Sequence, residues 1–112
     1  MIWLILWALI AHWVADFILQ SDKMALNKSK EYGWLWLHSS IYGCAMAIMV
    51  GAWIPVWGGI ALILSHALID GVTSRITSYL WQKEMRHRFF IVIGFDQLLH
   101  YVVLLAIMGV PA

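Results

Sequence analysis

Four long apolar stretches, separated by polar or turn-forming segments, constrain the fold of this chain more than any other feature. They cover about residues 2–20, 32–52, 56–74 and 89–110. Each approaches the ~20 residues that an α-helix needs to cross a bilayer. Because 63% of the residues are hydrophobic and only 12% are charged, a water-soluble fold of this size could not bury the apolar surface. The sequence predicts an all-α, polytopic membrane protein: one domain, residues 1–112, built as a four-transmembrane-helix bundle.

Basic residues predict how this bundle is oriented. All seven lie in the first and third connections, residues 20–31 and 73–88: Lys23, Lys28, Lys30, Arg75, Lys83, Arg86 and Arg88. Because cytoplasmic loops carry an excess of Lys and Arg, both connections are expected in the cytoplasm and both chain ends outside. The N-terminus has no basic signal-peptide region, so its apolar stretch is expected to stay as an anchor. The prediction is an N-out, C-out, multi-pass protein of the inner membrane.

Several other classes of function are disfavoured. The net charge of +1 and the lack of a basic stripe interleaved with aromatics argue against nucleic-acid binding. Cys44 is the only cysteine, so an internal disulfide is excluded, and its apolar surroundings predict a packing role. His87 lies between two arginines and is predicted to be a solvated loop residue.

Ionisable side chains interrupt all four apolar stretches. They are His12, Asp16, His38, His66, Asp70, Asp96 and His100. An Asp at the bilayer centre costs about 2.5–3.5 kcal/mol on insertion scales, whereas each Leu or Ile contributes only about 0.3–0.6 kcal/mol in the favourable direction. Ionisable residues in membrane helices normally face the bundle interior or a wet cavity. We therefore expect these seven side chains to converge on one polar site.

The spacing of these residues sharpens the expectation. Three pairs are four positions apart, which places both members on one helix face: His12 with Asp16, His66 with Asp70, and Asp96 with His100. In the predicted topology each Asp lies nearer the cytoplasm than its His, although the last span runs in the opposite direction to the other two. The pattern predicts a layer of carboxylates beneath a layer of imidazoles.

Mixed imidazole and carboxylate ligands favour a divalent metal, zinc first and manganese or iron as alternatives. Seven ligands exceed the four of a tetrahedral zinc, so either two ions or one ion with acid/base groups is expected. Asp16, Asp70 and Asp96 are then the candidate catalytic carboxylates. Two alternatives stay open: a proton or divalent-cation relay, and a polar core that specifies helix packing in a small membrane scaffold or holin-like protein.

Residues near this layer are candidate substrate contacts: Gln20, Lys23, Lys28, Tyr42 and Arg75. The three cations are expected around the cytoplasmic mouth of the site, which suits a phosphate or an anionic lipid head group, although they could serve only to set the topology. Thr73 and Thr77 continue the face of Asp70, which predicts a helix running past the membrane edge and a solvated groove. Gln97, beside Asp96, could hydrogen-bond a ligand, although its own position on the helix points about 100° away from Asp96.

These motifs resemble a known family. His12-x-x-x-Asp16-Phe17-x-Leu19-Gln20, the lone His38, His66-x-x-x-Asp70 and Asp96-Gln97-x-x-His100 are similar, in the same order, to those of small bacterial and phage membrane proteins described as a domain of unknown function. The resemblance implies the four-helix membrane architecture and the same His and Asp positions. In general pattern alone, the chain is also similar to small membrane proteins described as metal-dependent hydrolases.

The leading hypothesis from the sequence is a membrane-embedded, metal-dependent hydrolase. It is expected to act from the cytoplasmic side on a lipid-linked or phosphate-bearing substrate. The other expected partners are the membrane lipids that surround it. A homo-oligomer is a further possibility, because four short helices leave little room to shield a site.

Overall fold

The computed structural model describes residues 1–111, and all of the regular elements in that range are helices. The long helices are α1 (Ile2–Trp13), α3 (Tyr32–Val50), α4 (Gly58–Gln82) and α5 (Arg86–Ile107). The short ones are a π-helical turn η1 (Val14–Ile18), α2 (Asp22–Asn27) and a 3-10 turn η2 (Gly51–Trp53). The predicted all-α fold class is confirmed.

Three helices are long and apolar enough to cross a membrane: Tyr32–Trp53, which joins α3 to η2, then α4 and α5. The first apolar stretch is shorter. It is helical over Ile2–Ile18 instead of about residues 2–20, and at 1.5 Å per residue it is about 25 Å long. This length lies near the lower limit for crossing about 30 Å of hydrocarbon.

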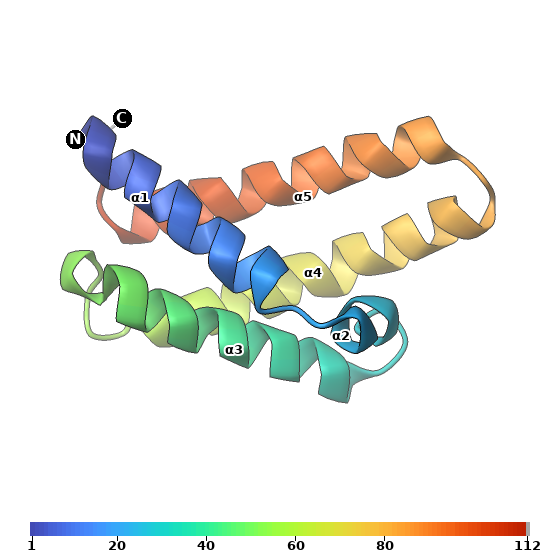
Figure 1. Cartoon of the computed structure of the whole chain (residues 1–112), viewed down its shortest axis with the longest axis horizontal. Coiled ribbons are helices and arrows are strands. Elements are labelled where there is room, and N and C mark those ends of the chain that lie inside the picture. Colours follow the sequence, from blue (N-terminus) through green and yellow to red (C-terminus); the bar gives the residue numbers. More distant parts are fainter. Residues whose placement is uncertain (112) are drawn as a thin grey trace.

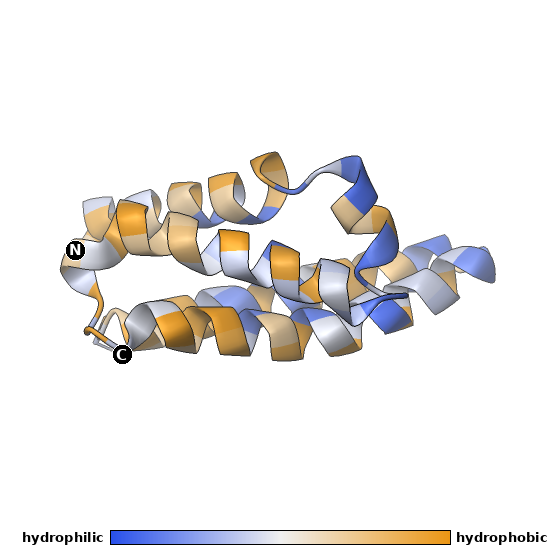
Figure 2. Ribbon diagram, turned by 90° about the horizontal axis from the view of Figure 1, so that it is seen from below, coloured by the Kyte–Doolittle hydropathy of each residue, from blue (hydrophilic) through white to orange (hydrophobic). Residues whose placement is uncertain are grey.

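The helices run back and forth along one long axis (Figure 1). α4 packs against both α3 and α5, while α1 contacts α3 and α5, and α2 contacts α3. Both chain ends and the turn between α3 and α4 lie at one end of the molecule, and α2 and the α4–α5 turn lie toward the other. Figure 2 shows that hydrophilic residues gather at this second end. The two basic connections therefore share one end of the bundle.

The connection between α4 and α5 is shorter than the sequence suggested. α4 continues to Gln82, so Thr73 and Thr77 lie on a helix that extends beyond the apolar stretch, as their pattern indicated. Only residues 83–85 link the two helices. Glu84 adopts a left-handed conformation with φ of 56°, and the Met85 N–H donates to the Leu80 carbonyl, a common way of closing a helix C-terminus.

Two predictions about single residues are wrong. His87 is exposed as expected but lies in the first turn of α5, because the helix begins at Arg86 and not after the arginine pair. Cys44 lies on the exposed face of α3 and does not pack in the core. The buried face of that helix is formed by neighbouring residues such as Tyr42, Gly43 and Met46.

Local capping explains how the chain turns back after η1. The Ser21 hydroxyl accepts a hydrogen bond from the Met24 N–H (3.2 Å), which satisfies one of the free donors at the start of α2. Lys23 lies over the ring of Trp34, with its Nζ 5.4 Å from the ring centroid. The first polar connection is thereby held against α3.

Close packing of α3 on α4 depends on Gly43. A Cβ atom at this position would lie 2.1 Å from Cγ1 of Ile63 and 3.2 Å from the carbonyl oxygen of Gly59. Small residues at such crossings let membrane helices approach closely. This approach brings the polar residues of the two helices within hydrogen-bonding distance.

We predict that Gly43→Ala lowers the free energy of unfolding in detergent by about 1–3 kcal/mol, because Ile63 and the α4 backbone must move. The matched control is Gly94→Ala on α5, where a Cβ has no neighbour within 4 Å, and where alanine should be neutral or stabilising. Denaturant titration followed by circular dichroism measures both. Equal stabilities of the two variants would contradict this packing.

Candidate metal centre

The structure brings together all seven ionisable side chains that interrupt the apolar stretches. Each is buried, with exposed fractions between 0% and 6%. They come from five elements: His12 from α1, Asp16 from η1, His38 from α3, His66 and Asp70 from α4, and Asp96 and His100 from α5. Residues far apart in the sequence thus form one polar cluster inside an otherwise apolar bundle.

Asp16 lies at the centre of this cluster. Its Oδ1 accepts hydrogen bonds from Nε2 of His38 (2.9 Å) and Nε2 of His66 (3.0 Å), and its Oδ2 accepts one from Nε2 of Gln97 (3.3 Å). A single carboxylate therefore links η1 to α3, α4 and α5. The π-helical turn that carries Asp16 is a feature found frequently at functional sites.

Asp70 forms a second centre, nearer the polar end of α4. Its Oδ1 accepts a hydrogen bond from Nε2 of His100 (3.1 Å), and its Oδ2 is 2.9 Å from the ammonium of Lys28 and 3.4 Å from Nε2 of His38. The chain after α2 is thereby tied to α4. The Ser29 and Ser78 hydroxyls, 2.8 Å apart, make a second tie between the same segments.

Asp96 completes the cluster on α5. Its Oδ1 accepts a hydrogen bond from the Thr73 hydroxyl on α4 and lies 3.4 Å from Nε2 of His100. Its Oδ2 accepts one from Nε2 of Gln97 (3.0 Å). The carboxylate is thus held by groups from both helices of the α4–α5 hairpin.

Gln97 points into the cluster, contrary to the helix-angle prediction. Its Oε1 accepts a hydrogen bond from Nε2 of His12 (2.8 Å), while its amide nitrogen reaches Asp16 and Asp96. The Gln97 side chain is long and flexible, so it bends back toward Asp96 although the two residues point in different directions from the helix. Nδ1 of His12 accepts from the Tyr42 hydroxyl (2.8 Å), so both ring nitrogens of His12 have partners.

Two sets of these residues could hold a metal ion. In each set, every residue offers one ligand atom, and these atoms all lie within 4.8 Å of one another. The first set is Asp16, His38, His66 and Asp70, and the second is Asp16, Asp96 and His100. Ligand atoms around a tetrahedral zinc are separated by about 3.3 Å, given bonds of about 2.0–2.2 Å. Within the first set, Nε2 of His38 and Nε2 of His66 lie 2.9 Å and 3.0 Å from Asp16, and Nε2 of His38 lies 3.4 Å from Asp70. Within the second set, Nε2 of His100 lies 3.4 Å from Asp96, so these contacts are close to that separation. Asp16 belongs to both sets.

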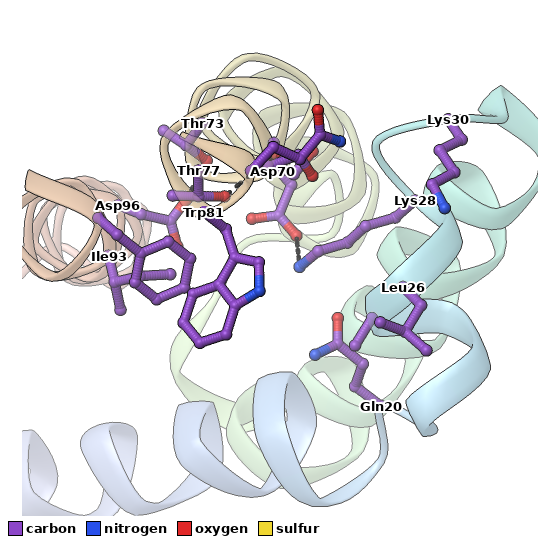
Figure 3. A pocket seen from close by; sticks show the side chains of 15 residues that line it. Gln20, Leu26, Lys28, Lys30, Asp70, Thr73, Thr77, Trp81, Ile93 and Asp96 are labelled. Carbon is purple, nitrogen blue, oxygen red and sulfur yellow. Dashed lines mark hydrogen bonds and ion pairs between the residues drawn. The ribbon is translucent and has the colours of Figure 1, made fainter. Parts of the chain in front are cut away.

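A cavity of about 450 Å³ leads to this cluster from the polar end of the molecule. Asp70, Thr73 and Asp96 lie at its inner wall (Figure 3). Lys28 projects into it from the segment after α2 and meets Asp70, while Trp81 and Ile93 lie on the opposite side. The groove that the sequence predicted beside α4 is therefore present, and it opens toward the basic connections.

The structure separates the predicted substrate contacts into three groups. Gln20 and Lys28 line the cavity. Tyr42 is buried behind the cluster, where it bonds to His12. Lys23 and Arg75 do not line the cavity; Lys23 lies over Trp34, and the Arg75 guanidinium lies 4.9 Å from the ring centroid of Tyr32. His12, predicted as a ligand, belongs to neither set of potential metal ligands.

Three further polar side chains bond to the cluster, and of these only Ser39 was not identified from the sequence. Gln97 joins His12 to two carboxylates, Thr73 donates to Asp96, and the Ser39 hydroxyl lies 3.3 Å from Nδ1 of His66. For Gln97 a signal was available, because a polar amide within a strongly apolar span normally faces the protein interior. Thr73 was recognised as continuing the face of Asp70 but not as a partner of Asp96. Ser39 carried no signal, since single hydroxyls are common in membrane helices.

The fold and the cluster together define a class: an all-helical protein with membrane-length helices and a buried His/Asp cluster that could hold a metal ion. The chain belongs to the family described as "Protein of unknown function (DUF3307)", which matches residues 4–111. The resemblance to a domain of unknown function is thus confirmed over nearly the whole chain. No curated protein and no solved structure shows a significant similarity to it.

We predict that protein purified in detergent contains a divalent metal and that Asp16→Ala removes all of it, because Asp16 belongs to both sets of ligands. Asp96→Ala should remove only the portion held by the second set. His87→Ala, which changes an exposed histidine on α5, is the matched control and should retain the metal.

Inductively coupled plasma mass spectrometry measures the metal, and circular dichroism checks that each variant is folded. If the Asp16→Ala variant keeps its full metal content, or the wild type binds none after incubation with zinc, manganese and iron, the metal assignment fails.

Proposed function

We propose that this protein is a membrane-embedded, metal-dependent hydrolase that acts on a lipid-linked or phosphate-bearing substrate from the cytoplasmic side of the inner membrane. The observation that carries the proposal is the position of the His/Asp cluster at the inner wall of a cavity that also holds the Lys28 ammonium. A metal-ligand set, an access route and a cation for an anionic substrate thus occur together.

The membrane placement that we propose has four spans, and α1 and η1 together form the shortest of them. Six of the seven basic residues lie on the two connections or in the first turn of α5, at the polar end of the bundle, and Arg75 lies on α4, seven residues before the end of that helix. By the positive-inside rule this end faces the cytoplasm, with both chain ends outside. The exposed side chains of Trp7, Ile48 and Val102 are typical of helix surfaces in contact with lipid.

The charge of the cluster supports a resident cation. With neutral imidazoles, three buried carboxylates face one ammonium, and uncompensated buried charge is expensive. One divalent ion would balance the remaining two negative charges. His66 fits a ligand role further, because its Nδ1 lies beside the Ser39 hydroxyl and metal-bound histidines normally engage the second ring nitrogen in a hydrogen bond.

In this proposal different residues bind the metal ion, position its ligands and act as the general base. Asp16, His38, His66 and Asp70 hold the ion, with Gln97 and His12 positioning Asp16 from behind. A divalent metal in such a site supplies Lewis acidity and an activated water. Asp96 lines the cavity and is not paired with Lys28, so it is the preferred general base when one ion is bound. When two are bound, Asp96 and His100 serve as ligands of the second. Zinc suits the mixed donors best, ahead of manganese and iron.

The cavity walls support a substrate that is both anionic and apolar. Lys28 and Lys30 line one side, and Leu26, Trp81 and Phe89 add apolar surface. A phosphate beside Lys28 would lie next to Asp70, where the ion is held, and a hydrocarbon chain could lie against the aromatic rings. Lysine is a common partner for phosphate groups.

Transport is the second candidate, supported by the chain of hydrogen bonds that runs from Asp96 through Gln97 and His12 to Tyr42. Beyond Tyr42, however, the core is apolar and tightly filled by Met46, Leu62 and Leu104, each at most 1% exposed. A relay across the membrane needs polar groups or water on both sides of the site. The hydrolase therefore ranks first.

The proposed topology predicts which turns are accessible on the periplasmic side of the inner membrane. In a Cys44→Ser background, a Pro55→Cys variant should react with a membrane-impermeant maleimide in spheroplasts, and an N-terminal epitope tag should bind its antibody there. A Glu84→Cys variant should react only after the membrane is permeabilised. An outside location for residue 84, or an internal N-terminus, would overturn the four-span arrangement.

For the reaction, we expect metal-dependent release of phosphate from phosphatidic acid in mixed micelles, used as a probe of lipid phosphates. Lys28→Gln should raise KM about tenfold or more, because it removes the cation beside Asp70, whereas Lys23→Gln, on the same connection but outside the cavity, should not. Phosphate release that is independent of metal, or unaffected by Asp96→Ala, would argue against the hydrolase.

A further inference from the structure

A second hollow lies on the outer surface of the bundle, between α3 and α4, and shares no lining residue with the cavity at the cluster. Its volume is about 690 Å³. Leu35 and Ala67, only 4% and 5% exposed, form its floor together with Gly71. Its sides are exposed apolar residues, Trp36 from α3 and Leu64, Leu68 and Val72 from α4. We refer to this hollow as the α3–α4 groove.

A single cation closes the α3–α4 groove at its polar end. Arg75 donates a hydrogen bond to the Gly71 carbonyl, and its guanidinium lies 4.9 Å from the ring centroid of Tyr32, so its position is fixed from two sides. Within residues 1–111, no carboxylate lies within ion-pair distance of Arg75. The remaining N–H groups of the guanidinium are free for an external anion, and arginine is well suited to bind phosphate.

The length of the groove is close to the depth of one lipid leaflet, which is half of about 30 Å of hydrocarbon. From Leu64 to Arg75 the helix rises about 16 Å, at 1.5 Å per residue. In the proposed membrane placement Arg75 lies toward the cytoplasmic end of α4, at the depth of the phosphates, and Leu64 lies deeper in the hydrocarbon. An apolar channel that ends at a phosphate-binding cation thus follows the direction of an acyl chain.

We propose that the α3–α4 groove binds an anionic phospholipid of the cytoplasmic leaflet, with an acyl chain against Leu35 and Ala67 and the phosphate on Arg75. The charge favours this occupant over a zwitterionic lipid, whose own cationic group would face the guanidinium. The proposal rests on the membrane placement described above and not on the metal or the hydrolase activity. It assigns Arg75 a lipid-binding role away from the catalytic cavity.

Native mass spectrometry of the detergent-purified chain tests this, with phosphatidylglycerol and phosphatidylcholine carrying identical acyl chains. We expect the wild type to bind phosphatidylglycerol about fivefold more tightly, the effect of roughly one cation at the membrane surface. Arg75→Gln should abolish this preference. Arg88→Gln, which removes an exposed cation at the same end of the bundle but outside the groove, should preserve it.

Leu68→Trp provides a second variant, because residue 68 is 71% exposed and a larger ring there fills the groove without disturbing the core. It should weaken the binding of both lipids at least fivefold, with unchanged circular dichroism and metal content. The proposal is overturned if Arg75→Gln retains the preference for phosphatidylglycerol, or if Leu68→Trp binds both lipids as the wild type does. It is also overturned if the wild type is a dimer that Leu68→Trp dissociates, since the groove is then filled by a second copy.

Discussion

The hydrogen bonding of the buried Asp16 carboxylate is the constraint on which the rest of the structure depends. A carboxylate in an apolar bundle is tolerated only when its oxygens are fully engaged, and here the partners are His38, His66 and Gln97, each from a different helix. Satisfying one charge therefore fixes the positions of α3, α4 and α5 relative to η1. Between helices whose surfaces are otherwise apolar, such polar contacts add to the specificity of packing.

The same constraint explains why one part of the site was predictable and another was not. The free-energy cost of exposing an Asp or His to an apolar environment is large, so the burial of these residues in a common cluster could be predicted from the sequence. The four-residue spacing also correctly placed His66 with Asp70 on one face of α4. The path of the Gln97 side chain into the cluster was not predictable. Helix geometry fixes the direction of the Cα–Cβ bond, but a long flexible side chain can bend away from that direction. The π-helical turn at Asp16 also escaped prediction, since no local residue preference distinguishes it from an α-helical turn.

The helix boundaries could likewise be predicted only in part. The apolar stretches located the long helices, but hydrophobicity alone ended α4 near residue 74, whereas the helix continues to Gln82. Polar helical turns beyond a membrane edge have no hydrophobic signature, and only the spacing of Thr73 and Thr77 indicated them. This extension has a functional counterpart, because the added turns carry Ser78 and Trp81, which form the outer wall of the cavity.

The distribution of polar contacts also bears on the order in which the helices of this chain can assemble. Asp70 and Asp96 find His100 and Thr73 within the α4–α5 hairpin itself, whereas His66 of the same hairpin bonds to Asp16 and Ser39 outside it. Asp16 makes all three of its hydrogen bonds with later helices, and its one contact within the first apolar stretch is His12, 3.4 Å away. Because α3, α4 and α5 all follow it in the chain, η1 can reach its final position only after the last of these helices has been synthesised.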